Sequence, residues 1–278
     1  MRRFLCWLCL CVLLTTPAWA QEKEGGKYLA LTFDDGPSGR FTSALLEGLA
    51  EREVHATFFL CGYRVDQYPS LASEIAQGGH EIGLHGNAHR FFTEMGPQEV
   101  CTDLRTAREK LLAATGQSPT LMRPPGGLYD LEVLKKTDCA DLPIVLWSVD
   151  PQDWCCSDSG KIAARVIQKA QNGDIILMHD MSTSSVQAAF QIIDTLEDRG
   201  FEFVTVSELA FLAGTEMKGT EAYYKFPFDE KNASISERVA ATEPCAKLGF
   251  PPPRPRRAAL RDLTRLRRSP FRQPRAYL

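Results

Sequence analysis

The stretch YLALTFDDGP, residues 28–37, joins an apolar segment to a pair of acidic residues and a turn. Its first six residues are mostly apolar, as in a short strand of a parallel sheet that is buried on both faces. Gly36 and Pro37 favour a turn directly afterwards. The stretch therefore predicts a buried strand that ends in two neighbouring carboxylates, Asp34 and Asp35.

Similar short apolar runs recur along the chain and alternate with helical patterns. Besides residues 28–33, we expect strands at 55–60, 80–84, 120–123, 143–148, 174–178 and 202–206. We expect helices near 41–52, 68–77, 97–114, 129–138, 159–171, 185–198 and 207–213. Strands that alternate with helices indicate an α/β fold with a parallel sheet. Periodicity alone leaves open whether the sheet is a (β/α) barrel or an open, doubly wound sheet.

The first 20 residues have the pattern of a secretory signal peptide. Two arginines precede an apolar run of 11 residues, 4–14, and the segment ends in Ala-Trp-Ala at 18–20. These features are typical of such peptides, so we expect cleavage after Ala20. The run is too short to span a bilayer comfortably. We therefore expect an exported protein without a transmembrane anchor, located outside the cell, in the cell wall or in the periplasm.

The rest of the chain divides into three expected parts. We expect one α/β domain over residues 21–214 and a C-terminal extension over 215–250, because the alternating pattern fades after Gly214. Residues 251–278 form a basic tail rich in Pro and Arg, which we expect to be disordered. The tail can contact anionic wall polymers, or it can be a solvated extension without a partner.

Charge is distributed unevenly along the chain. The formal net charge is −3, although residues 254–278 hold nine Arg against the single acid Asp262. The body between residues 21 and 253 is consequently acidic. Because nucleic-acid binding needs a basic surface, the composition argues against nucleic acid as a partner.

Nine cysteines occur in the chain, and three of them lie in the expected signal peptide. The remaining six are Cys61, Cys101, Cys139, Cys155, Cys156 and Cys245. In an exported protein this even number permits up to three disulfides, whose pairing the sequence does not define. Free or buried thiols are the alternative. The spacing Cys-x-x-Cys is absent, which argues against a structural zinc cluster.

Residues with catalytic chemistry follow the predicted strands at their carboxyl ends. They are Asp34, Asp35, His85, His89, Arg123, Asp150, Asp153 and His179. Active sites of parallel α/β folds are built at these ends, in barrels and open sheets alike. The recurrence therefore indicates one site to which several strands contribute.

The two histidines His85 and His89 are four residues apart. Two imidazoles and one carboxylate leave an open position on a divalent ion, as in catalytic metal sites. Adjacent residues at a strand end point in different directions, so one of Asp34 and Asp35 can bind a cation while the other faces a water. The alternatives are turn formation by the acidic pair and an ordinary surface pair of histidines.

Three further residues suit a chemical role, and for two of them a purely structural role is the alternative. Arg123 can pair with a catalytic carboxylate and orient it. His179 suits a general acid, because the unperturbed pKa of histidine is about 6.5, but a buried histidine bonded to backbone is the alternative. Trp154 offers a flat surface for the apolar face of a sugar ring, whereas most tryptophans belong to the core.

Together these segments resemble the five motifs of the NodB-homology polysaccharide deacetylases, family four of the carbohydrate esterases. Residues 32–37, 85–89, 123–127, 150–154 and 177–179 occur in the order of the family motifs. The similarity of the strand and helix pattern extends over about residues 27–213. The resemblance implies an α/β fold that is a distorted, incomplete (β/α) barrel of about seven strands.

The resemblance also implies a metal site and a general base. Asp35, His85 and His89 correspond to the residues that hold a divalent metal in the family, commonly zinc or cobalt. Asp34 corresponds to the general base that removes a proton from the attacking water. Arg123 corresponds to the arginine that is oriented against this base.

The remaining roles implied by the resemblance concern the leaving group and the substrate. His179 corresponds to the general acid, and Asp153 to the residue that sets its pKa. The backbone N–H near Gly126 is expected to stabilise the oxyanion. Trp154 and Leu177 correspond to the walls of the pocket that takes the acetyl methyl group.

Two positions depart from the family pattern. Gly86 stands where the family usually has Ser or Thr, so a hydrogen bond of the loop between the two histidines is in doubt. Gly126 and Gly127 stand where an aromatic residue commonly follows Arg-Pro-Pro, so a surface for sugar stacking is in doubt. The adjacent Cys155 and Cys156 are not explained by the family pattern.

The resemblance implies a secreted, metal-dependent hydrolase that removes N-acetyl groups from N-acetylhexosamine units of a polysaccharide such as peptidoglycan or a chitin-like polymer. An O-deacetylase of a glycan such as xylan would use the same residues. A wall-binding module without turnover would be expected to lack Asp34, a metal histidine or His179, and all are present. A metal-free glycosidase with two carboxylates leaves His85 and His89 without a role.

Overall fold

The computed structural model describes residues 26–135 and 141–228. The expected signal peptide and the basic tail lie outside these residues. The chain divides into two compact units, Met1–Arg238 and Val239–Leu278, and every described residue lies in the first. Within the described part, no helix combines the length and the apolar character needed to cross a bilayer.

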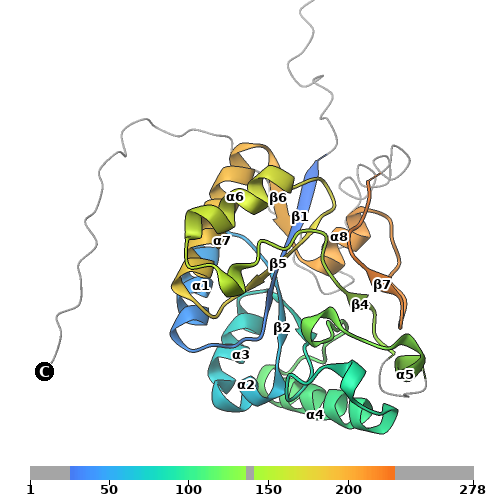
Figure 1. Ribbon diagram of the computed structural model, residues 1–278. Coiled ribbons are helices and arrows are strands. Elements are labelled where there is room, and N and C mark those ends of the chain that lie inside the picture. The colour runs from blue at the N-terminus through green and yellow to red at the C-terminus, as the bar shows by residue number, and fades with distance from the viewer. Residues whose placement is uncertain (1–25, 136–140, 229–278) are drawn as a thin grey trace, which may run out of the picture. The chain divides into compact units, whose positions relative to one another are not determined.

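Strands and helices alternate through most of the described chain (Figure 1). The strands are β1 (Lys27–Asp34), β2 (Thr57–Leu60), β3 (Glu81–Leu84), β4 (Ile144–Val145), β5 (Ile175–His179), β6 (Phe201–Val204) and β7 (Ala222–Tyr223). The α-helices are α1 (Arg40–Glu51), α2 (Gly62–Gln67), α3 (Pro69–Gln77), α4 (Pro97–Thr115), α5 (Leu131–Lys135), α6 (Ser159–Lys169), α7 (Thr183–Asp198) and α8 (Val206–Leu212). Three short 3₁₀ helices are η1 (Phe92–Glu94), η2 (Pro125–Gly127) and η3 (Asp153–Cys155).

The sheet is parallel and centred on β1. Five strands form the order β3-β2-β1-β5, with β6 paired to the first half of β1, and β4 pairs with β7 in a separate two-stranded sheet. Isolated parallel bridges join Met122 to β3 on one side and to β4 on the other, and a further bridge joins Val149 to β5. The bridges of Met122 connect the two sheets. The α/β fold predicted from the sequence, a distorted and incomplete barrel, is therefore confirmed.

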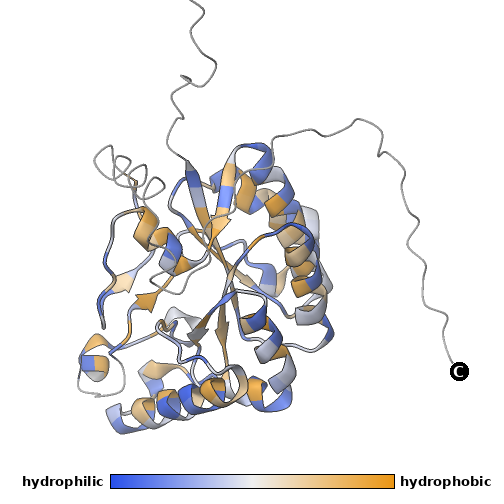
Figure 2. Cartoon of the chain, turned by 180° about the vertical axis from the view of Figure 1, so that it is seen from behind, coloured by the Kyte–Doolittle hydropathy of each residue, from blue (hydrophilic) through white to orange (hydrophobic). Residues whose placement is uncertain are grey.

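The core lies between the strands and the helices that surround them. Leu29, Leu31 and Phe33 of β1 are buried, and the Phe33 ring stacks on that of Phe58 in β2 with centroids 5.2 Å apart. Figure 2 shows the central strands largely in hydrophobic colours, whereas the helices carry hydrophilic residues on their outer faces. A strand covered on both sides must be apolar along its length, which accounts for the run at residues 28–33.

The structure differs from the predicted elements at a few places. Residues 120–123 do not form a strand, and only Met122 bridges to its neighbours. Pro124 and Pro125 follow at once, and proline cannot donate to a sheet, which accounts for the early end. Helix α5 begins at Leu131 rather than at residue 129, and residues 136–140 of the predicted helix lie outside the described part.

Besides the three 3₁₀ helices, one α-helix and one strand were not predicted. Helix α2 is only six residues long and begins at Gly62, directly after β2, so it has no room for a helical periodicity. Strand β7 has two residues and pairs with β4. Beyond it, Phe226 is buried and its backbone N–H donates to the carbonyl oxygen of Gly173, so the chain after Gly214 still contributes to the core.

The described cysteines are in two states. Cys101 is disulfide-bonded, and Cys61, Cys155 and Cys156 are free. Cys139 and Cys245 lie outside the described residues. Burial raises the pKa of the Cys61 thiol well above its ordinary value, with the nearby Asp35 and Asp34 acting in the same direction, so this thiol is held in its unreactive, protonated form.

Candidate active site

The carboxyl ends of β1 and β5 bring two predicted catalytic residues together. Asp34 of β1 is the register partner of His179 of β5. The next residue, Asp35, has a φ of 71°, in the left-handed region. This sharp change of backbone direction gives Asp34 and Asp35 different surroundings, as the sequence predicted for an acidic pair at a strand end.

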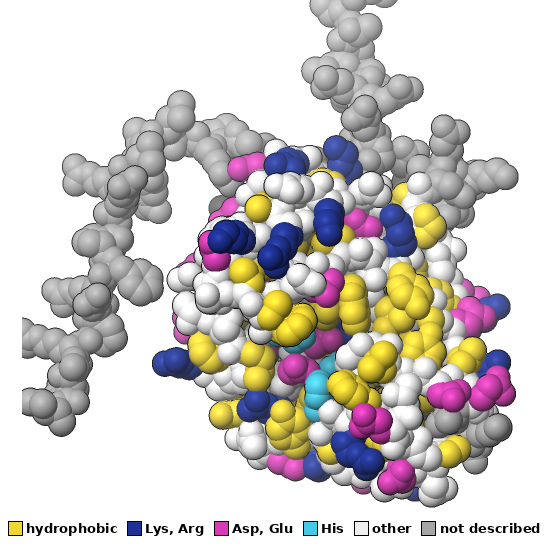
Figure 3. Space-filling model, viewed as in Figure 1, with side chains coloured by type: hydrophobic (Ala, Val, Ile, Leu, Met, Phe, Trp, Pro, Cys, Tyr) yellow, Lys and Arg dark blue, Asp and Glu magenta, His cyan; other side chains and the backbone are white. Residues whose placement is uncertain are grey.

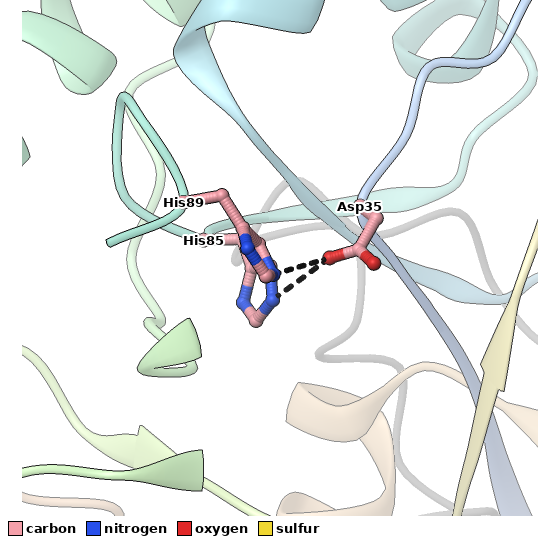
Figure 4. A group of neighbouring side chains, drawn as sticks. All are labelled: Asp35, His85 and His89. Atoms are coloured by element: carbon pink, nitrogen blue, oxygen red, sulfur yellow. Dashed lines mark ion pairs between the residues drawn. The ribbon is translucent and has the colours of Figure 1, made fainter. Parts of the chain in front are cut away.

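Asp35, His85 and His89 converge on one point (Figure 4). The Oδ1 atom of Asp35 lies 3.2 Å from Nε2 of His85 and 2.9 Å from Nε2 of His89. His85 directly follows β3, and His89 has a φ of 55°; the two ring centroids are 5.2 Å apart. Figure 3 shows histidine on this face beside acidic and hydrophobic side chains.

The donor set fits a divalent cation. Asp35 Oδ1 is buried and makes no hydrogen bond of acceptable geometry, although two ring nitrogens face it. One carboxylate and two imidazoles within reach of one another are the ligands of catalytic zinc and related sites. A cation at this point would satisfy an oxygen that otherwise lacks a partner.

The orientation of His85 is fixed by backbone. Its Nδ1 lies 2.7 Å from the carbonyl oxygen of Arg123. Because a carbonyl only accepts, Nδ1 carries the proton, and Nε2 presents its lone pair to the cation position. This contact ties the loop that carries His85 and His89 to the segment that carries Arg123.

The carboxylate of Asp35 is strongly stabilised in its charged form. Burial alone would raise its pKa, but the facing imidazoles of His85 and His89 outweigh burial and hold the pKa well below its usual value. The facing Asp35 carboxylate conversely raises the pKa of His89, against the opposing effect of burial. A carboxylate that stays ionised is ready to bind a cation over the whole physiological pH range.

Arg123 holds Asp34 in one orientation. Its Nη1 donates to Asp34 Oδ1 at 2.6 Å and to Thr32 Oγ1 at 2.8 Å. The other guanidinium nitrogens donate to the backbone oxygens of Val145 and Leu146, at 2.9 Å each. With every side of the guanidinium engaged, Asp34 is left with Oδ2 free of the arginine and 3.8 Å from Nε2 of His85.

His179 and Asp153 form the second charged pair. Nδ1 of His179 lies 2.8 Å from Asp153 Oδ1, and the backbone N–H of His179 donates to Oδ2 at 2.9 Å. Burial lowers the pKa of His179, but the hydrogen bond to Asp153 and the charges of Asp34, Asp153 and Asp35 raise it to about 9. Near neutral pH the ring is therefore protonated and able to give a proton from Nε2.

The other predicted residues occupy different positions around this centre. Leu177 is buried in β5 two residues before His179, so both side chains share one face of the strand. Trp154 follows Asp153 in η3 and is 67% exposed. Gly126 is exposed in η2, after Arg123 and two prolines. Asp150 instead accepts from the backbone N–H of Gln152 at 2.7 Å, which is a local turn contact.

Asp103 of α4 makes hydrogen bonds to the loop between His85 and His89, where Gly86 lacks the hydroxyl group that the family usually has. Its Oδ2 accepts from the N–H of Asn87 at 2.5 Å, and its Oδ1 accepts from that of Ala88 at 3.2 Å. A Cβ on Gly86 would come within 2.9 Å of Asp103 Oδ2. The carboxylate therefore occupies the space of the missing side chain and binds the loop between the two histidines.

Asp180 is a second buried carboxylate that the sequence reasoning missed. Its side chain accepts from Thr42 Oγ1, and its backbone oxygen accepts from Ser38. A Cβ on Gly36 would come within 2.8 Å of Asp180 Oδ1, so the glycine permits the close approach. Burial raises the pKa of Asp180 to about 6, against the lowering effect of Thr42. This contact joins the turn after β1 to the end of β5.

Comparison with known proteins agrees with this geometry. The profile of the polysaccharide deacetylase family matches residues 21–145. The peptidoglycan-N-acetylglucosamine deacetylase PgdA of Listeria monocytogenes is 37% identical over 188 residues, which cover 68% of this chain and 40% of that protein. The chain thus spans less than half the length of this relative. A peptidoglycan-N-acetylglucosamine deacetylase of Bacillus cereus is 36% identical, over 66% of this chain and 88% of that protein.

A solved structure extends the agreement to the fold. A family 4 acetyl xylan esterase from Clostridium thermocellum, in complex with a cobalt ion, superimposes with a TM-score of 0.68 and 31% identity. The superposition covers 72% of this chain and all of that chain. The sequence similarity extends over 88% of the Bacillus cereus relative, and the fold match covers all of the solved esterase chain. The chain therefore belongs to the NodB-homology polysaccharide deacetylase family, carbohydrate esterase family four.

Proposed function

We propose that this protein is a metal-dependent hydrolase that removes N-acetyl groups from N-acetylhexosamine units of peptidoglycan or a chitin-like polymer. The observation that carries the proposal is the pairing of Asp34 with His179 at neighbouring strand ends, beside the group Asp35, His85 and His89. A base, an acid and a cation site close together at neighbouring strand ends are the parts that amide hydrolysis needs.

Each pair of residues has a defined task in the proposed reaction. Asp34 removes the proton of the attacking water, and Arg123 holds its carboxylate in one orientation. A divalent cation held by Asp35, His85 and His89, zinc or cobalt in our proposal, supplies Lewis-acid activation of the water and the acetyl carbonyl.

His179 and Asp153 act in the second half of the proposed reaction. The backbone N–H near Gly126 stabilises the charge that develops on the acetyl oxygen. His179 donates its Nε2 proton to the departing nitrogen, and Asp153 keeps the ring protonated. The C–N bond breaks, and the products are acetate and a free amine on the sugar. Leu177 and Trp154 border the space for the acetyl methyl group.

The site of action follows from the sequence rather than from the described residues. We propose export through the N-terminal 20 residues and action on the cell wall or outside the cell. The basic residues 254–278 would attract anionic wall polymers. Salt-dependent sedimentation of the full chain with purified cell walls, compared with a chain that ends at residue 250, tests this part.

A second candidate is removal of O-acetyl groups from a glycan such as xylan. The similarity to a Clostridium acetyl xylan esterase favours it, and the same residues would act. An alcohol is a better leaving group than an amine, so this reaction needs less help from His179.

One experiment separates these functions. Chitooligomers, peptidoglycan fragments and acetylated xylan are incubated with the protein, with and without a chelator, and loss of acetyl groups is followed by mass spectrometry. We expect the mass of an amino-sugar substrate to fall by about 42 Da, the difference between an acetyl group and a hydrogen atom. The chelator should abolish this loss. Acetyl loss from xylan alone, or acetyl loss that survives the chelator, would contradict the proposal.

A further inference from the structure

The segment after Arg123 lacks a side chain at Gly126, where the family commonly has an aromatic residue. Gly126 and Gly127 have φ values of 63° and 69°, in the left-handed region. A Cβ on Gly126 would lie 3.0 Å from Cε1 of Phe91 and 3.8 Å from Cγ of Leu128. The space beside Gly126 is thus already taken by an aromatic ring that comes from another loop.

Phe91 is held beside Gly126 by the loop of the metal site. It lies two residues after His89, and its backbone oxygen accepts from the N–H of Glu94 at 3.0 Å. The neighbouring Phe92 is buried and lies at the position where a Cβ on Gly86 would contact both its ring and Pro125. Phe92 is therefore buried beside Gly86, whereas the neighbouring Phe91 is partly exposed.

Phe91 and Leu128 are two exposed apolar side chains on either side of Gly126. Its side chain is 38% exposed, and that of Leu128, across Gly126, is 47% exposed. Single exposed apolar side chains are common, but these two border an exposed glycine whose N–H belongs to the proposed oxyanion site. Two side chains are far too small for a protein interface, which buries about 800 Å² on each partner. They match the size of one sugar ring.

We propose that Phe91 is a substrate-binding residue, whose ring forms a platform for the apolar face of a pyranose ring of the glycan and replaces the side chain missing at position 126. The proposal rests on the proposed glycan substrate. Axial C–H groups give a hexosamine ring one apolar face, and a flat aromatic ring beside the pocket buries it while the acetyl group reaches the centre. Gly126 is itself exposed, so the backbone beside Phe91 is accessible to the glycan.

Binding is tested in the Asp34→Asn background, so that the ligand is not consumed. The probes are chitopentaose and a peptidoglycan tetrasaccharide, and dissociation constants are measured by calorimetry. Adding Phe91→Ala should weaken binding about tenfold, the factor that corresponds to about 1.4 kcal/mol. Adding Phe91→Trp should restore it, because a larger flat ring offers the same surface. Phe211→Ala is the matched control, since Phe211 on α8 is 39% exposed, and it should not change binding.

A kinetic measurement in the chain with Asp34 intact completes the test. Phe91→Ala should raise KM about tenfold and change kcat much less, as expected for contacts made equally in ground and transition states. Unchanged binding with Phe91→Ala, or failure of Phe91→Trp to restore binding, would overturn the platform. So would absence of binding of both probes to the Asp34→Asn parent. If the parent binds a probe through Phe91 but the wild type releases no acetate, the platform stands and the proposed function fails.

Discussion

Arg123 and Asp34 form a buried ion pair in which Nη1 lies 2.6 Å from Oδ1 and the side chains are 0% and 4% exposed. The guanidinium also lies over the Phe59 ring, with Cζ 4.1 Å from the ring centroid. An ion pair this deep is expensive to desolvate and is stable only when every donor is engaged, as the bonds to Thr32, Val145 and Leu146 achieve. The pair therefore fixes one orientation of Asp34.

Loss of the arginine should destabilise the fold. Arg123→Met leaves the Asp34 charge buried without its partner, and such changes reduce the free energy of unfolding by about 3–5 kcal/mol. Urea denaturation measures the effect. Arg52→Met is the control, because Arg52 pairs with the exposed Asp194 at 2.8 Å, and its loss should reduce the free energy by less than about 1 kcal/mol. Equal losses in the two variants would contradict the structural importance of the buried pair.

Asp34→Asn should abolish acetate release and leave the metal bound. The amide preserves the shape of the carboxylate but cannot accept the proton of the attacking water. Asp35, His85 and His89 are unchanged in this variant, so metal content measured by mass spectrometry should match that of the wild type. Wild-type rates of acetate release would refute the role of Asp34 as the base.

Asp103→Ala should weaken metal binding through the loop between His85 and His89. The variant frees the N–H groups of Asn87 and Ala88, and loss of such supporting contacts lowers metal affinity by about 10- to 100-fold. Competition with a fluorescent zinc chelator measures the affinity. Asp194→Ala, which removes an exposed carboxylate, should leave it unchanged. An affinity unaffected by Asp103→Ala would show that the loop is held by other means.

The activity should fall at alkaline pH, where His179 loses its proton. Its pKa is raised from 6.5 to about 9, so the acid form is present at neutral pH and is lost as pH rises through the folded pKa. A bound cation opposes protonation, so we expect the alkaline limb of kcat/KM between pH 6.5 and 9. Asp153→Asn removes the main stabilising partner and should move the limb to lower pH. A limb that does not move would contradict this pairing.

The same shift makes the fold less stable at alkaline pH. Because the folded protein binds the His179 proton more tightly than the unfolded chain, the stabilisation is complete below about pH 6.5 and is lost as pH rises toward 9. Denaturation at pH 6.5 and pH 9 measures the difference. Asp153→Asn should reduce the pH dependence, and an equal dependence in both proteins would contradict the assignment.

The sequence predicted the strand ends well for a simple physical reason. Buried parallel strands are continuous apolar runs, and the polar residues at their carboxyl ends stand out, as Asp34 at the end of β1 and His179 at the end of β5 do. Six of the predicted strands lie where the structure has strands. The prediction of a strand at residues 120–123 was wrong. The apolar pattern does not show that the two prolines that follow end the hydrogen bonding of the strand.

The residues that the sequence missed act across long separations in the chain. Asp180 bonds to Thr42, 138 positions away, and Phe91 faces Gly126 from a different loop. Asp103 lies within a helix whose periodicity explains its position without any reference to the metal loop. Each departure from the family pattern, Gly86 and Gly126, was visible, but the side chain that compensates for it depends on packing that no local pattern encodes.

The most direct test of the account is the metal content of His85→Ala, measured with acetate release after exhaustive dialysis. Wild-type protein should retain about one divalent ion per chain, lose activity with a chelator and regain it with one equivalent of zinc or cobalt. His85→Ala should retain no ion and no activity, whereas His55→Ala, which changes a histidine outside the cluster, should behave as wild type. Full metal content in His85→Ala, or full activity of the metal-free wild type, would contradict the account.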